Sequence, residues 1–320
     1  MSPTVERSEP ISASLAFTRA VKQQEKLRLA LDGVTGGGKT FTGLRIGTYF
    51  ASQMGSRIAL IDSERSSAKK YASDFDFDHL SLPDFDPRTY IAAIQLAIDN
   101  GYGIIIIDSL SHAWEGTLEL KDNVAARSRT KDSFAAWREV TPVHNELVDV
   151  MLRAPAHIIA TMRSKMEYLV ERDEATGKNR ISKVGLRPIQ RDGVEYEFDI
   201  VGDMDIENNL IISKTRCSAL TGKVFRRPGD EFASVVYDWL NDGEAPPPPP
   251  PLADSKVVAG LIGRLNELPP EIRKQAKADW VEKLGKPDTL LLSQLEEAEK
   301  LVDTWAPPID APASDAEGTA

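Results

Sequence analysis

The segment that most constrains the fold of this chain covers residues 33–40 and reads Gly-Val-Thr-Gly-Gly-Gly-Lys-Thr. It fits the pattern G-x-x-x-x-G-K-S/T. An apolar run at residues 27–31 precedes it and a helical stripe of apolar residues follows it, which is the context that the pattern requires. Glycines let backbone amides turn inward, and a helix start adds its positive end. The segment predicts a site for a di- or triphosphate, with an ordinary glycine turn as the alternative.

Residues of this loop have separate expected roles. Lys39 would reach the β- and γ-phosphates, and the hydroxyl of Thr40 would bind Mg²⁺. Asp108 follows an apolar run at residues 104–107. Because ligands of parallel sheets bind beyond the carboxyl ends of the strands, Asp108 is the expected carboxylate for that ion, and capping of the next helix is its alternative role. The expected contacts of the nucleotide are Gly33, Gly36, Gly37, Gly38, Lys39, Thr40 and Phe41.

A carboxylate that orients the attacking water does not follow Asp108 directly, because this chain has Ser109 where many ATPases carry a glutamate. Glu64 is the candidate, since it lies just past a second predicted strand and therefore on the same rim of the sheet as the glycine loop. A solvated turn carboxylate is the alternative interpretation of Glu64. Glu115 is the reserve candidate for the base.

Strands and helices alternate along most of the chain, which predicts an α/β fold with a largely parallel sheet flanked by helices. The run at residues 104–107 has no polar face, as is typical of a parallel strand covered on both sides. The other predicted strands cover residues 27–31, 57–62, 157–161, 196–201 and 209–214. The predicted helices cover residues 14–26, 87–100, 134–153 and 230–241.

Six consecutive prolines at residues 246–251 predict a stiff spacer and a domain boundary. Beyond them, apolar residues at helical spacing predict a bundle of about three helices. The last residues are rich in proline, alanine and acids, which predicts disorder. The expected divisions are a flexible start at residues 1–13, an α/β domain at 14–244, a polyproline linker at 245–253, a small helical domain at 254–305 and an acidic tail at 306–320.

The formal net charge of −10 argues against a generally basic surface that coats nucleic acid. The single cysteine, Cys217, cannot form a disulfide within the chain, and no group of Cys and His has metal-ligand spacing. The first residues lack the apolar region of a secretion signal, and no apolar run is long enough to span a bilayer. The sequence predicts a cytoplasmic protein with no membrane partner.

One segment departs from this acidic balance. Residues 175–191 contain five basic side chains and no acid, namely Lys178, Arg180, Lys183, Arg187 and Arg191. The segment follows the predicted strand that ends at Thr161, so we expect a loop that ATP could order. Such a cluster predicts contact with a nucleic-acid backbone and binding that weakens steeply with salt. A solvated hairpin is the alternative.

The residues Asp62-Ser-Glu-Arg resemble the strand end of RecA-type recombinases. In those proteins the glutamate two residues past the aspartate activates water and an aromatic ring stacks on adenine, which implies these roles for Glu64 and Tyr71. More closely, the chain from roughly residue 15 to residue 242 is similar to phage-encoded RecA-like ATPases of single-strand annealing and recombination. The similar segments are residues 26–31, 107–116, 137–142, 159–168, 184–188 and 195–203.

This resemblance implies a RecA-like P-loop NTPase core that uses ATP and Mg²⁺. It also implies that Lys214 and Arg216 reach the γ-phosphate of a neighbouring subunit, so that catalysis needs a homo-oligomer. Lys165, in one of the similar segments, joins the expected DNA contacts. One position differs, because Thr161 stands where RecA itself carries a glutamine that senses the γ-phosphate.

Together these features lead us to expect an ATP-dependent enzyme that oligomerises on single-stranded DNA and assists annealing or strand exchange. If a phage encodes it, it would act in the cytoplasm of a bacterial host. A single-strand-binding or replication protein is a further expected partner. Two alternatives are a ring-forming helicase-type motor of the same fold and a nucleotide-switched adaptor that recruits a replication or recombination partner.

Overall fold

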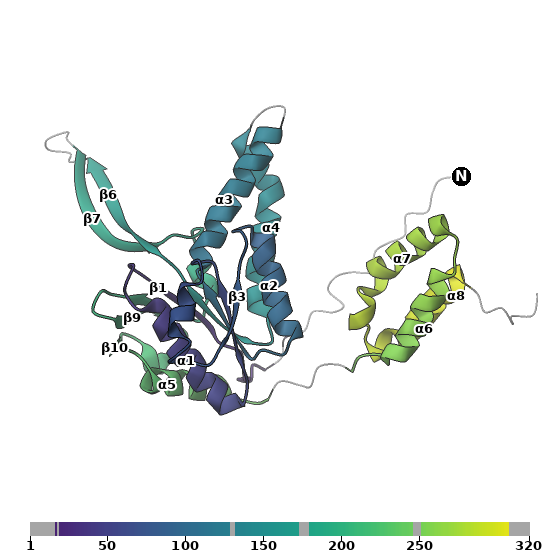
Figure 1. The fold of residues 1–320 in the computed structure, drawn as a ribbon, viewed down its shortest axis with the longest axis horizontal. Helices are drawn as coiled ribbons and strands as arrows, with labels where there is room; N and C mark the ends of the chain where they lie inside the picture. Colours follow the sequence, from purple (N-terminus) through teal and green to yellow (C-terminus); the bar gives the residue numbers. More distant parts are fainter. Residues whose placement is uncertain (1–16, 18, 129–131, 173–178, 246–250, 307–320) are drawn as a thin grey trace, which may run out of the picture. The chain divides into compact units, whose positions relative to one another are not determined.

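The computed structural model describes residue 17 and residues 19–128, 132–172, 179–245 and 251–306. Contacts within the chain divide it into two compact units, residues 1–246 and 247–320. Figure 1 shows the elements of each unit.

The larger unit is built on an eight-stranded sheet with the order β10-β9-β8-β1-β5-β4-β2-β3. From β8 to β3 in this order the strands run parallel, whereas β9 and β10 are antiparallel to their neighbours. All residues of β1, β2, β4 and β5 are buried. The predicted α/β class with a largely parallel sheet is thus confirmed. The bounds are β1 Arg28–Gly33, β2 Ile58–Asp62, β3 Asp78–Ser81, β4 Ile104–Asp108, β5 His157–Thr161, β8 Ile200–Met204, β9 Asn209–Thr215 and β10 Val224–Arg226.

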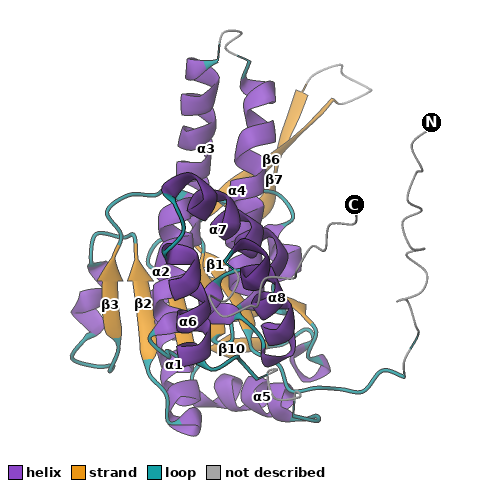
Figure 2. Cartoon of the chain, turned by 90° about the vertical axis from the view of Figure 1, so that its right-hand side faces the viewer, coloured by secondary structure: helices purple, strands orange, loops and turns teal. Residues whose placement is uncertain are grey.

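Helices cover both faces of this sheet (Figure 1, Figure 2). Alternate residues of β4 point to opposite faces: Ile104 and Ile106 pack in the core with α1 and α5, whereas Ile105 and Ile107 pack with α2, α3 and α4. This double coverage explains why the strand has no polar face. The helices are α1 Lys39–Met54, α2 Pro87–Asp99, α3 Leu110–Arg127, α4 Ser133–Arg153 and α5 Asp230–Asn241.

A two-stranded antiparallel sheet projects from the larger unit (Figure 1). It consists of β6 Ser164–Arg172 and β7 Asn179–Pro188, and it follows β5 almost directly. Most of residues 175–191 therefore belong to a strand, so the prediction of a loop is wrong for β7, and the structure has the hairpin that was the alternative. Pairing with β6, which has one register shift between Glu167 and Tyr168, satisfies backbone groups that an open loop would leave to water.

Two other predictions of local structure are wrong. Residues 17 and 19–26 are not helical, because the chain runs beside the end of α5, where the amide of Gln24 donates to the carbonyl of Glu244 at 2.9 Å. The strand predicted at residues 196–201 begins only at Ile200, since residues 194–197 form a 3₁₀ turn. The helices predicted at residues 87–100, 134–153 and 230–241 are present within one residue of the expected bounds.

The smaller unit contains α6 Ser255–Asn266, α7 Pro270–Leu284 and α8 Leu295–Trp305. Trp280 of α7 is almost fully buried and packs in a core with Leu265 of α6 and Val302 of α8. Each helix therefore contributes its apolar stripe to one small core. Among the helices of the described residues, none combines the length and apolar character needed to cross a membrane.

Candidate active site

The glycine loop leaves β1 at the carboxyl edge of the sheet and enters α1. Gly36 and Gly38 both have a φ of 83°, in the left-handed region that favours glycine. Gly38 is the N-cap of α1, and no side chain caps this helix start. Because the first amides of an uncapped helix can bind an anion, the loop has the conformation and the donors of a phosphate site.

Lys39 lies at the centre of this loop. Its Nζ donates hydrogen bonds to the carbonyl oxygens of Gly33 and Val34, each at 2.9 Å. Burial lowers the pKa of Lys39, while the nearby Asp108 and Glu64 carboxylates counteract this shift. The side chain is therefore folded onto the loop, surrounded by acceptors that a phosphate can replace.

Asp108, the last residue of β4, connects the loop with β5. Its Oδ2 accepts a hydrogen bond from Thr40 Oγ1 at 2.7 Å, and its Oδ1 accepts one from Thr161 Oγ1 at 2.5 Å. Burial raises the pKa of Asp108, and the two hydroxyls oppose this rise. A buried carboxylate that has only neutral partners would be stabilised by a cation. Thr161 therefore holds the carboxylate that is expected to bind Mg²⁺.

The residues present fit Mg²⁺ better than a metal held by protein ligands alone. Within the described part of the chain, no group of three or more His, Cys, Asp and Glu could hold a metal ion. Mg²⁺ characteristically takes one or two protein oxygens and completes its shell with phosphate and water. The Thr40 hydroxyl and the Asp108 carboxylate supply such oxygens.

These residues line one cavity of about 280 Å³. Of the predicted site residues it includes Gly36, Gly38, Lys39, Thr40, Glu64, Tyr71 and Asp108. Three further lining residues, Thr35, Ser67 and Arg163, were not named from the sequence. Arg163 could have been found from its place just past β5, at the same edge of the sheet. The predicted Gly33, Gly37 and Phe41 are outside this lining.

The turn that carries Glu64 is fixed by the end of β2. Asp62 Oδ1 accepts a hydrogen bond from the amide of Glu64 at 2.6 Å, and its Oδ2 lies 3.0 Å from His79 Nε2. Asp62 is fully buried by these contacts. Glu115, the reserve candidate, is exposed on α3 and does not line the cavity. The geometry therefore favours Glu64 as the carboxylate that faces a bound phosphate.

An aromatic cluster borders the cavity. The ring of Phe41, in the first turn of α1, meets Tyr71 edge to face with centroids 5.7 Å apart and Phe75 with centroids 5.0 Å apart. Tyr71 also lines the cavity, whereas Phe41 supports it from the side. Stacking of adenine on Tyr71 stays a prediction.

Lys214 and Arg216 lie at the opposite edge of the sheet from the loop. In the register of β8 and β9, Lys214 pairs with Val201 near the start of β8, whereas Gly33 of the loop pairs with Met204 at its end. At about 3.3 Å per residue, the separation along the strand is roughly 10 Å or more. These cations therefore lie at the opposite edge of the sheet from the chain's own cavity.

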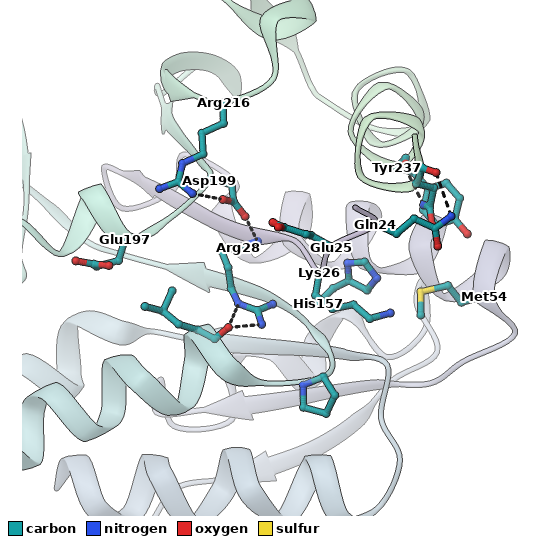
Figure 3. Close-up of a pocket in the computed structure, with 13 residues that line it drawn as sticks. Gln24, Glu25, Lys26, Arg28, Met54, His157, Glu197, Asp199, Arg216 and Tyr237 are labelled. Atoms are coloured by element: carbon teal, nitrogen blue, oxygen red, sulfur yellow. Dashed lines mark hydrogen bonds and ion pairs between the residues drawn. The ribbon is translucent and has the colours of Figure 1, made fainter. Parts of the chain in front are cut away.

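Both cations at this edge have partners, and Figure 3 shows the contact of Arg216 with Asp199. Lys214 Nζ donates to the carbonyls of Glu195 at 3.2 Å and Tyr196 at 2.5 Å, and also to that of Phe198. Arg216 Nη1 lies 3.3 Å from Asp199 Oδ1, yet its side chain is 61% exposed. Arg216 lines a cavity of about 680 Å³ that opens at this edge. Its exposure leaves it accessible to a neighbouring molecule.

The structure describes the predicted DNA contacts only in part. Lys165 is exposed at the start of β6, Arg187 pairs with Asp192 at 2.6 Å, and Arg191 donates to Asn145 at 3.3 Å. Arg180 and Lys183 are on β7. Lys178 lies outside the described residues.

A second carboxyl group of interest lies just before the loop. Asp32 of β1 is 4% exposed and pairs in register with Asp203 of β8. Its Oδ1 is buried with no hydrogen-bond partner among the described residues. Burial, together with the neighbouring Asp203 carboxyl, raises the pKa of Asp32 to about 8. The folded protein therefore binds a proton at neutral pH that the unfolded chain releases.

Replacing Asp32 by asparagine is expected to stabilise the protein increasingly as the pH rises. In the wild type, stability falls between the unfolded pKa of 3.8 and the folded pKa of about 8, because only the folded state keeps the proton in this range. Asparagine carries no such proton. The gain in unfolding free energy should be larger at pH 8.5 than at pH 5 by on the order of 3 kcal/mol. Urea unfolding at both pH values measures it, and equal effects would contradict the assignment.

Comparison with known proteins identifies one family. The family described as an AAA domain matches residues 25–225, which include the glycine loop, Glu64, Asp108 and Arg216. A solved structure of a KaiC-like protein from the hyperthermophilic archaeon Pyrococcus horikoshii OT3 is 17% identical, with a TM-score of 0.37. The match covers 61% of this chain and 82% of that chain. No curated protein matches the chain.

Proposed function

The chain belongs to the AAA-domain family and has a P-loop ATPase fold, and from this premise we propose that it hydrolyses ATP while acting on single-stranded DNA. The activity would assist annealing or strand exchange. The observation that carries the proposal is the meeting of the loop, Lys39, Asp108 and Glu64 in one cavity. Separate strands bring a phosphate cradle, an expected oxygen ligand for Mg²⁺ and the Glu64 carboxylate to the same place.

Each residue has a task in the proposed hydrolysis. The loop amides and Lys39 bind the β- and γ-phosphates, while Thr40 and Asp108 hold Mg²⁺. Bound Mg²⁺ neutralises charge on the phosphates. Glu64 orients a water for attack on the γ-phosphorus and accepts its proton, and the bond from the γ-phosphorus to the β–γ bridging oxygen breaks to release ADP.

The proposed DNA contact is the β6–β7 hairpin. Thr161, at the end of β5, binds Asp108, and β6 begins at Ser164. The hairpin therefore starts next to the ion site, with Arg187 opposite Lys165 at this end, whereas Lys183 and Arg180 pair with Tyr168 and Glu171 farther along β6. Positive side chains that neutralise phosphates supply affinity for a nucleic-acid backbone without sequence preference.

The proposed assembly is a homo-oligomer in which Arg216 and Lys214 face the nucleotide of the next subunit. The exposure of Arg216 and its distance from the chain's own loop support this arrangement. A neighbouring cation can stabilise the charge of a transferring phosphoryl group. Electron micrographs of the protein on DNA with a slowly hydrolysed ATP analogue distinguish the two possible assemblies. A filament would support the proposed function, whereas a closed ring would favour a helicase-type motor.

The test of the function is the rate of ATP hydrolysis with and without single-stranded DNA. We expect DNA to increase the rate, and replacement of Lys178, Arg180 and Lys183 by alanine to weaken binding of DNA. The slope of log affinity against log salt should become shallower by about 2, since each contact with a single strand contributes roughly 0.7. A matched triple variant at Arg88 of α2, Arg153 of α4 and Lys223 in the turn before β10, all exposed and outside the hairpin, should keep the wild-type slope. An unchanged slope in the variant at Lys178, Arg180 and Lys183 would show that the hairpin is not the DNA contact.

A further inference from the structure

The phosphate cavity contains a cation to which the proposed hydrolysis gives no task. Arg163, just past β5, contacts Glu64 through two hydrogen bonds, from Nε to Oε1 at 2.9 Å and from Nη2 to Oε2 at 2.7 Å. The side chains of Arg163 and Glu64 are 39% and 25% exposed. Such a bidentate pair fixes the position and the plane of the carboxylate.

The backbone of Arg163 is held from two sides. Its amide donates to Ser111 Oγ on α3 at 2.9 Å, and its carbonyl accepts from the amide of Ile189, at the base of the hairpin, at 2.7 Å. The turn of Glu64 is held separately by Asp62. Two anchored segments therefore meet in this ion pair, which is the support that a preorganised site requires.

We propose that Arg163 is a positioning residue for hydrolysis, which holds the Glu64 carboxylate toward the attacking water and offsets its negative charge beside the polyphosphate. This inference rests on the proposed function, because it concerns the orientation of the base in the same site.

The charges of the cavity show why such a residue is needed. Glu64 and Asp108 both line the space that a polyphosphate must enter. The negative charges of these two carboxylates oppose the binding of a negatively charged polyphosphate. Lys39 supplies one positive charge that offsets them. Arg163 adds a second cation, and its bonds to both Glu64 oxygens place that charge on the carboxylate itself.

The same contacts tune Glu64 as a base. Burial acts to raise the pKa of Glu64, but the hydrogen bonds and charge of Arg163, helped by His112 and Lys39, lower it overall. The carboxylate therefore stays ionised and able to accept a proton at neutral pH. Loss of Arg163 should raise the pKa of Glu64, because the contacts that mainly offset the effect of burial on this pKa are gone.

The experiment compares Arg163→Ala and Arg163→Lys in the full chain, with Arg153→Ala as a matched control. Arg153 is an exposed arginine that pairs with Asp149 outside the cavity. We expect kcat of Arg163→Ala to fall about 10- to 100-fold, because a misplaced base loses its orientation to water. The acidic limb of its kcat/KM profile should move to higher pH. Arg163→Lys should return the acidic limb part of the way to its wild-type pH, since lysine keeps the positive charge but cannot make the bidentate guanidinium contact. Arg153→Ala should match the wild type.

A double variant distinguishes positioning from a direct role. If Arg163 acts through Glu64, Arg163→Ala should lower kcat little further in a Glu64→Gln background. Overturning results are a full additional loss in that background, or an acidic limb that stays at the wild-type pH in folded Arg163→Ala.

A measurement without turnover separates this inference from the proposed function. Carbon NMR of labelled glutamate carboxyls, with Glu64→Gln for assignment, follows the titration of Glu64 in nucleotide-free protein. Glu64 should titrate at lower pH in the wild type than in Arg163→Ala. An identical titration in the two proteins would overturn the inference, whereas a wild type that titrates as expected but hydrolyses no ATP would refute the proposed function alone.

Discussion

Replacing Lys39 by alanine is expected to lower ATP turnover by at least about 100-fold, since each preorganised cation or donor at a developing phosphate charge is worth factors of this size. The Nζ of Lys39 lies at the centre of the loop, bonded to Gly33 and Val34. Alanine leaves the loop glycines in place and removes only the charge and these two bonds. Phosphate release at saturating ATP and Mg²⁺ measures the effect.

Lys223→Ala is the control, because Lys223 is exposed in the turn before β10. It should hydrolyse ATP at the wild-type rate. Turnover near the wild-type rate in folded Lys39→Ala would show that this loop is not the nucleotide site.

The Lys39→Ala variant also tests the shared site. Its subunits keep Arg216 at the opposite edge of the sheet, whereas Arg216→Ala subunits keep an intact loop. A mixture of the two should recover activity above the sum of the separate variants if Arg216 completes the site of a neighbour. Simple additivity of the two rates would argue against a shared site.

Replacing Glu64 by glutamine is expected to leave ATP binding largely intact and to lower kcat by about 100-fold or more, the usual contribution of a positioned general base. Glutamine keeps the shape of the side chain but cannot accept the proton of water. Titration calorimetry measures binding and phosphate release measures turnover. The two quantities together separate loss of the base from loss of the site.

Glu115→Gln provides the matched control for this prediction. Glu115 is exposed on α3, outside the cavity lining, and its replacement should leave kcat at the wild-type value. If Glu115→Gln stops hydrolysis and Glu64→Gln does not, the assignment of the base is wrong.

Much of the fold could be predicted where the decisive residues are contiguous. The apolar runs that became β4 and β5 and the capped start of α2 at Pro87 are local signals. The short strand β3 could not be predicted in this way, because most of its residues are exposed and it lacks an apolar run. The segment before β1 was wrongly predicted as a helix, since its conformation depends on pairing with Glu244 at the far end of the larger unit.

The sequence by itself determined the phosphate loop, because the glycines, Lys39 and Thr40 that form it are neighbours in one strand–loop–helix segment. It also indicated Asp108 and Glu64, since parallel strands bring their carboxyl ends to one edge. Only the tertiary structure decided the partners of these carboxylates. Thr161 contacts Asp108, which is 53 residues earlier in the sequence, and Arg163 contacts Glu64, which is 99 residues earlier. Such contacts depend on the order of strands in the sheet, which no local pattern specifies.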